Sequence, residues 1–81
     1  MKCDFTHQFI RRYHSLPKGI QRKFDKQLKY LLQNLRHPSL RVKKYDEEKD
    51  IWQARVNRNY RFYFLIRGDT YILLEIKPHP E

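Results

Sequence analysis

The sequence predicts a small α+β domain in which two N-terminal helices pack on one face of an antiparallel sheet of four to five strands. Two observations support this fold class. Residues 6–35 repeat apolar side chains at helical spacings of three and four, whereas the residues after Pro38 alternate apolar and polar side chains. With 81 residues the chain is long enough for one domain, residues 1–81, and too short for two.

The first half of the chain favours a short strand followed by two helices. Lys2–Phe5 is the expected strand, and Thr6 is a suitable N-cap for the first helix. Ser15 is the expected N-cap of the second helix, because a proline follows it in the opening turn. This helix is expected to end near Leu35, since Pro38 disfavours helical geometry at the preceding residue.

The second half of the chain predicts an antiparallel meander. Its four expected strands are Leu40–Tyr45, Ile51–Val56, Tyr60–Ile66 and Thr70–Lys77. Gly68 marks a tight turn between the last two strands. In the last strand, alternation predicts that the side chains facing the helices are those of Ile72, Leu74 and Ile76. Pro78 and Pro80 lack N–H donors, so the ladder is expected to end before them.

The hairpin at Trp52–Phe64 is the most informative stretch for function. Its apolar residues share one side of the strands, so that side is expected to be buried. The opposite side presents Arg55 and Arg61, with Arg58 at the tip of the turn. Charges displayed on a sheet are held in fixed geometry, so this face is the first candidate for a functional site.

The formal net charge of +9 predicts attraction to a polyanion: RNA, DNA, the ribosome, an anionic membrane or an acidic protein. Cys3 is the only cysteine, which excludes an internal disulfide and favours a reducing cytoplasm. No apolar stretch has the length of a membrane helix, and no signal peptide is recognisable, so a cytoplasmic location is expected. The four histidines have no metal-ligand spacing, so no metal or cofactor is expected.

Four segments taken in order resemble the RelE/ParE superfamily, the toxin halves of toxin–antitoxin pairs: SLPKGIQRKF, NLRHPSLRVKKY, IWQARVNRNYRFYF and YILLEIKPH. The resemblance spans Thr6 to His79 and implies the RelE-like microbial RNase fold. RelE-like members cleave mRNA in the ribosomal A site, and ParE-like members poison DNA gyrase. The resemblance therefore implies a cognate antitoxin, the ribosome and mRNA as partners. A gyrase poison and a non-catalytic RNA-binding relic of the same fold remain alternatives.

RNA cleavage without a metal needs a base for the 2′-OH, a cation beside the phosphate and an acid for the leaving 5′-oxygen. Arg61 matches the arginine of the family's Y-R-x-x-Y/F motif, which implies a phosphate-stabilising role. An ion pair between Arg61 and Glu75 is the structural alternative. His79 is the acid or base candidate, because an unperturbed imidazole has a pKa of roughly 6.5.

Further site residues follow from the same resemblance. RelE-like toxins often place lysines on the strand before the hairpin, where this chain has Lys43 and Lys44; alternation allows only one of them to face Arg61. Glu75 is a candidate base or a holder of Arg61. Many RelE-like nucleases carry an arginine and a tyrosine after the last strand, whereas this chain has Pro80 and Glu81. The expected RNA-binding residues, including two tyrosines that would substitute there, are Arg55, Arg58, Lys77, Tyr63 and Tyr45.

Overall fold

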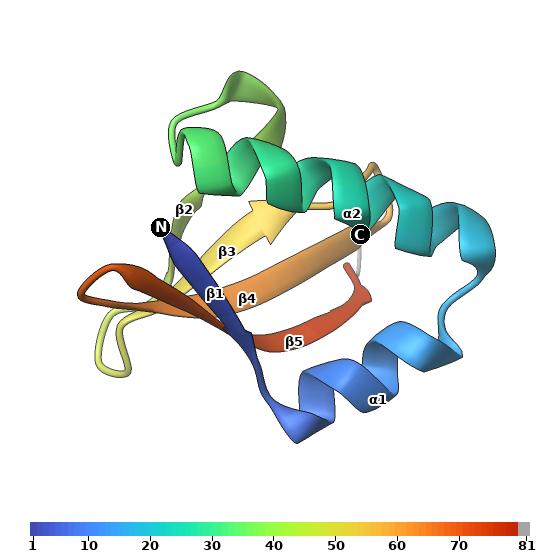
Figure 1. Ribbon diagram of the computed structural model, residues 1–81, viewed down its shortest axis with the longest axis horizontal. Helices are drawn as coiled ribbons and strands as arrows, with labels where there is room; N and C mark the ends of the chain where they lie inside the picture. Colours follow the sequence, from blue (N-terminus) through green and yellow to red (C-terminus); the bar gives the residue numbers. More distant parts are fainter. Residues whose placement is uncertain (80–81) are drawn as a thin grey trace.

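A computed structural model describes residues 1–79 and confirms the predicted α+β fold (Figure 1). The elements, in chain order, are β1 (Lys2–Phe5), α1 (His7–Ser15), α2 (Lys18–Gln33), the 3₁₀ helix η1 (Pro38–Leu40), β2 (Lys43–Asp46), β3 (Ile51–Arg55), β4 (Tyr60–Arg67) and β5 (Thr70–Pro78). The five strands form one sheet in the order β1-β5-β4-β3-β2. Among residues 1–79, no helix is long and apolar enough to cross a membrane.

The sheet is mixed rather than fully antiparallel. β2, β3, β4 and β5 form the predicted antiparallel meander, but β1 runs parallel to β5, with Lys2 opposite Thr70 and Phe5 opposite Leu73. The chain between β1 and β5 includes both helices and the other three strands, which is ample for the crossover that a parallel pair requires. The expectation of a purely antiparallel sheet was therefore wrong at this edge.

The core lies between the helices and one face of the sheet. The ring of Phe24 in α2 lies 5.2 Å from Phe9 of α1 and 5.1 Å from Phe62 of β4. Ala54, Phe62 and Ile76 occupy one row across β3, β4 and β5, and all three are buried. Figure 1 shows α2 lying along the sheet and α1 beside β5. The opposite face of the sheet carries Arg55, Arg61 and Tyr63.

The first helix begins as predicted, but the second does not. The Thr6 hydroxyl oxygen accepts a hydrogen bond from the Phe9 amide at 3.1 Å, which confirms the N-cap of α1. Ser15 is the last residue of α1, and its hydroxyl donates to the Arg12 carbonyl oxygen at 2.7 Å. The N-cap position of α2 is Pro17, which makes no side-chain hydrogen bond. The predicted cap at Ser15 was wrong because this hydroxyl closes α1 instead.

The connection from α2 to β2 differs from the prediction at both ends. Helix α2 ends at Gln33, before Leu35, and the Asn34 amide donates to the Tyr30 carbonyl oxygen at 2.8 Å. The expected strand Leu40–Tyr45 starts only at Lys43, because η1 occupies its first position. Arg41 then adopts the left-handed backbone region at φ 47°, which interrupts any strand geometry.

A bulge in β5 inverts the predicted alternation. Tyr63 pairs with Glu75 while the next residue of β4 pairs with Leu73, so Leu74 is the extra residue. Tyr71 and Leu73 are buried in the core, although the sequence pattern placed Ile72 and Leu74 there. Beyond the bulge the parity is restored, and Ile76 is buried as predicted.

The last strand also extends further than expected. Pro78 belongs to β5 and pairs with Tyr60, and the His79 amide donates to the Asn59 carbonyl oxygen at 2.7 Å. The ladder tolerates the missing N–H of Pro78 because the following residue supplies the next donor. Pro80, the second proline expected to stop the ladder, lies outside the described residues.

Candidate functional site

Two guanidiniums, those of Arg55 and Arg61, lie at one end of the β3–β4 hairpin, on the face of the sheet opposite the core. Together with Arg41, whose charge also acts on Arg61, they are called the guanidinium cluster. Arg55 and Arg61 are direct partners across β3 and β4, and Lys77 of β5 is the next partner of Arg61. The Arg61 Nη1 donates to the Asn57 carbonyl oxygen at 2.7 Å and to the Tyr60 carbonyl oxygen at 2.9 Å. Within residues 1–79, its Nε and Nη2 make no hydrogen bond. These N–H groups are therefore available to an incoming oxyanion.

The cluster carries positive charge without a local counterion. Burial lowers the pKa of Arg61, and the neighbouring charges of Arg55 and Arg41 lower it further. Among the described residues, none of these three guanidiniums forms an ion pair with a carboxylate. A group of like charges held close together is favourable only when an anion lies among them.

The position of Arg55 is fixed from the core side of the sheet by a buried amide. The Gln27 side chain of α2 is 6% exposed, and its Nε2 donates to the Arg55 carbonyl oxygen at 2.7 Å and to the Ser39 carbonyl oxygen at 3.0 Å. Ser39 completes the link by donating its hydroxyl to Gln27 Oε1 at 3.1 Å. Helix α2, η1 and the end of β3 are thereby joined directly behind the guanidinium cluster.

The structure brings His79 to the same end of the hairpin. Its amide is hydrogen-bonded to Asn59 in the β3–β4 turn, two residues before Arg61. The side chain is partly exposed, and its imidazole forms no hydrogen bond within residues 1–79. Arg58, exposed in the same turn as predicted, also offers its carbonyl oxygen to Arg61 Nη1 at 3.4 Å. The backbone geometry thus brings the predicted imidazole and the predicted guanidinium to one end of the sheet.

The sheet register separates the two candidate lysines. Lys43 pairs with Gln53 and so lies on the face of Arg61, with its side chain exposed. Lys44 pairs with Trp52 on the opposite face. Its Nζ lies 4.4 Å from the centroid of the Trp52 ring and 2.6 Å from an Asp50 carboxylate oxygen. Lys44 therefore packs against the edge of the sheet, away from the guanidinium cluster.

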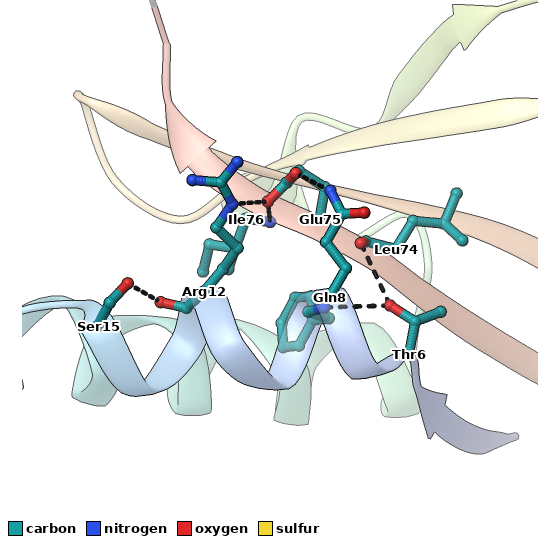
Figure 2. A network of polar contacts seen from close by, with 8 residues as sticks. Thr6, Gln8, Arg12, Ser15, Leu74, Glu75 and Ile76 are labelled. Carbon is teal, nitrogen blue, oxygen red and sulfur yellow. Dashed lines mark hydrogen bonds and ion pairs between the residues drawn. The ribbon is translucent and has the colours of Figure 1, made fainter.

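Glu75 does not hold Arg61. Figure 2 shows Gln8 and Arg12 reaching from α1 to the Glu75 carboxylate. The Arg12 Nε lies 3.1 Å from Oε1, which also accepts a hydrogen bond from the Ile76 amide, and Gln8 donates to Oε2. The structural alternative that the sequence predicted, an ion pair between Arg61 and Glu75, was therefore wrong. Since both carboxylate oxygens are occupied by α1 and β5, Glu75 fastens α1 to the sheet.

The two candidate tyrosines form one edge-to-face pair on the face of Arg61. Their ring centroids are 4.8 Å apart, and the Lys77 Nζ lies 5.2 Å from the Tyr63 centroid on the same face. Tyr63 is only 5% exposed beneath these neighbours, whereas Tyr45 is 55% exposed. Of the two rings expected to stack on a base, Tyr45 is the one that presents free surface.

Sequence reasoning missed Arg41 as a member of the site. Its guanidinium contributes to the field at Arg61, although strand alternation across Leu40–Tyr45 gave no reason to single it out. The helical turn before Arg41 and its left-handed backbone, which direct it toward the hairpin, leave no simple pattern in the sequence. In the described part of the chain, no group of three His, Cys, Asp or Glu side chains is arranged to hold a metal ion.

No protein-family model matches the chain, and no curated protein sequence matches it. Several solved structures do match the chain. The YoeB/ParE toxin from Agrobacterium tumefaciens has a TM-score of 0.82 and 13% identity, covering 99% of this chain and 100% of its own. The archaeal RelE-RelB complex from Pyrococcus horikoshii has a TM-score of 0.77 and 22% identity, covering 95% and 92%. The isolated E. coli RelE toxin has a TM-score of 0.78 and 14% identity, covering 99% and 85%.

These structures share one fold with the chain over nearly its whole length. The RelE-like fold predicted from the ordered sequence segments is confirmed. Several of the matching structures are toxin–antitoxin complexes, including RelE with RelB and YoeB with YefM.

Proposed function

We propose that the protein is the toxin of a toxin–antitoxin pair and cleaves mRNA on the ribosome without a metal ion. The guanidinium cluster supports this most strongly. Arg61 is held at Nη1 by three backbone carbonyls and has free N–H groups at Nε and Nη2. It is flanked by Arg55 and Arg41, and no carboxylate of the described residues forms an ion pair with any of the three. Such a site has the charge and geometry that favour an RNA phosphate.

The proposed chemistry is attack of a 2′-hydroxyl on the adjacent phosphate. A base takes the 2′-OH proton as the 2′-oxygen bonds to phosphorus, and the bond from phosphorus to the 5′-oxygen breaks. The products are a 2′,3′-cyclic phosphate and a 5′-hydroxyl, whose proton comes from the acid. Arg61 donates its free N–H groups to the phosphate oxygens as charge develops there. His79, whose amide is hydrogen-bonded to the hairpin turn, serves as the acid or base, and Lys43 supplies a further cation on the face of Arg61.

The antitoxin is the second partner in this proposal. Structures with this fold include toxins bound to RelB and to YefM. A toxin with a net charge of +9 is suited to an acidic or amphipathic antitoxin, and the ribosome and its mRNA offer the same negative charge. The proposed site of action is therefore the cytoplasm, with the antitoxin competing against the ribosome.

The proposal is tested by inducing the chain in cells without an antitoxin. We expect growth arrest, a rapid fall in translation, and new mRNA 5′ ends within translated codons. Arg61→Ala should abolish the new ends, because the phosphate loses its fixed donor. Arg67→Ala is the matched control: it removes an exposed arginine from the same strand, outside the cluster.

A parallel assay of plasmid supercoiling separates the alternatives. Relaxed plasmid with intact mRNA would overturn the ribonuclease and favour a gyrase poison. Normal growth in cells that contain soluble protein, with neither effect, would favour an RNA-binding relic.

A further inference from the structure

A basic groove lies between α2, η1 and the β3–β4 turn, and it shares Arg55 with the face of the sheet that carries Arg61. Its volume is about 590 Å³. We call it the cationic groove and define it by its five charged lining residues, Lys23, Lys26, Arg41, Arg55 and Arg58. Among the described residues that line it there is no carboxylate. The groove therefore concentrates positive charge over an area suited to an extended anion.

The charges of the cationic groove are not neutralised by the protein. None of its five residues belongs to an ion pair in the described chain, where the ion-paired cations are Lys2, Arg12 and Lys44. Arg41 is placed in the groove by a left-handed backbone at φ 47°, a conformation that costs a non-glycine residue free energy. Arg41 keeps this strained backbone although its guanidinium lies among other positive charges.

Two flat rings line the same groove. Tyr30 of α2 and His37 stack with centroids 3.8 Å apart and an angle of 7° between the rings. The Ser39 amide donates to His37 Nδ1 at 3.2 Å, which helps to hold the imidazole against Tyr30. Stacked rings beside a row of cations are typical of sites for single-stranded nucleic acid. An acidic peptide would use the cations alone.

The cationic groove is continuous with the guanidinium cluster. Arg41 and Arg55 line the groove, and their charges also act on Arg61. An RNA strand with one phosphate at Arg61 would therefore reach the groove by way of these two guanidiniums.

We propose that the cationic groove binds the single-stranded RNA that flanks the phosphate held at Arg61. The phosphates lie against the lysines and arginines of the groove, and the Tyr30–His37 stack offers a surface to a base. This inference rests on the proposed function for the identity of the RNA as substrate. It adds a second binding surface, on the helix side of the molecule, to the face of the sheet.

The test uses the full chain and a fluorescent 12-nucleotide single-stranded RNA, with affinity measured by anisotropy across a salt series. The groove variant is Lys23→Glu with Lys26→Glu. The control is Lys18→Glu with Lys29→Glu, two exposed lysines of the same helix that do not line the groove and give the same change in net charge. We expect the groove variant to lose at least about tenfold in affinity and its salt slope to fall by about 1.4, the value for two phosphate contacts to a single strand. The control should lose about threefold or less. Equal losses of RNA affinity in the groove variant and in the control variant would overturn the proposed role of the groove.

A second measurement separates this inference from the proposed function. Arg61→Ala should abolish cleavage while its RNA affinity falls by less than that of the groove variant. Wild-type chain that binds RNA through the groove but cleaves nothing would overturn the ribonuclease and leave the groove standing. A groove variant that cleaves mRNA with an unchanged KM would overturn the groove and leave the ribonuclease standing.

A poly-glutamate peptide of twelve residues is the competitor that tests the other class of ligand. The inference expects it to displace the RNA only at much higher concentration. Displacement at equal concentration would assign the groove to an acidic protein segment instead. Circular dichroism verifies that each variant is folded, and Lys23→Gln with Lys26→Gln should give a smaller loss in the same direction.

Discussion

The buried side-chain amide of Gln27 donates to the backbone carbonyl oxygen of Arg55 at 2.7 Å, which connects α2 to the end of β3, where Arg55 of the guanidinium cluster lies. The same Nε2 donates to Ser39, so one side chain joins three elements of the fold. Backbone carbonyl oxygens that lose a buried donor remain unsatisfied unless water replaces it. The position of the cluster therefore depends on a residue of the core.

Gln27→Leu tests this connection. The substitution keeps similar volume but leaves the carbonyl oxygens of Ser39 and Arg55 without their donor. We expect the free energy of unfolding to fall by about 1–3 kcal/mol in urea denaturation. Gln33→Leu, at an exposed position of the same helix, should change it by less than about 0.5 kcal/mol. A Gln27→Leu protein as stable as the control would show that the connection adds nothing.

The two glycines predict opposite effects of the same substitution. Gly68 has φ +59° in the β4–β5 turn, where an added Cβ is strained although no atom lies within 4 Å. Gly68→Ala should lower the free energy of unfolding by about 1 kcal/mol. Gly19 lies in α2 with equal free space, so Gly19→Ala should raise it by about 0.4–1 kcal/mol. Thermal unfolding of the two variants side by side measures the difference, and shifts of the same sign would contradict the assigned backbone conformations.

The ion pair between Arg12 and Glu75 should contribute little despite its central place between α1 and β5. Arg12 is 57% exposed, so water screens the attraction. A double-mutant cycle of Arg12→Ala and Glu75→Gln should give a coupling free energy of about 1 kcal/mol or less. A coupling well above that value would mean that the pair is shielded from solvent. The loss of RNA cleavage in Glu75→Gln would restore this carboxylate as a candidate base.

The thiol of Cys3 should be unreactive at neutral pH. Burial raises its pKa from 9.0 to about 11, with the charge of Asp4 as a smaller cause. At pH 8 its alkylation by iodoacetamide should be at least about tenfold slower than that of a cysteine peptide, because the thiolate is the nucleophile. Alkylation at the peptide's rate would show that the thiol is exposed in solution.

The same shift predicts how stability depends on pH. The folded-state pKa lies above the unfolded one, so the stabilising contribution of Cys3 is complete below about pH 9 and is lost as the pH rises through about 11. Comparison with Cys3→Ser, which has no such titration, isolates this contribution from that of the tyrosines. Parallel stability curves for the two proteins between these pH values would contradict the shift.

The sequence pattern predicted the parts of the fold that local rules decide. The period-two alternation of Trp52–Phe64 placed Arg55 and Arg61 on one face, and the Thr6 cap began α1 where expected. These features depend on neighbours in the chain, so they can be recognised without tertiary information.

The errors came from features that tertiary contacts decide. The bulge at Leu74 inverted half of β5, and no residue type marks it in the sequence. The pairing of Glu75 with Arg12 rather than Arg61 depends on where α1 docks, which strand parity does not contain. The choice between Lys43 and Lys44 needed the register of β2 against β3. The candidate site was thus predictable in its residue types and only partly in its geometry.

The central claim is that the Arg61 guanidinium stabilises the phosphate during cleavage. Its most direct test is the single-turnover rate of mRNA cleavage on purified ribosomes, with Arg61→Ala compared against Arg67→Ala at saturating toxin. The account predicts a rate constant lower by about 10²–10³ for Arg61→Ala, the usual cost of removing one charge-stabilising donor, and a change of less than about twofold for Arg67→Ala. An Arg61→Ala protein that cleaves at the wild-type rate would contradict it.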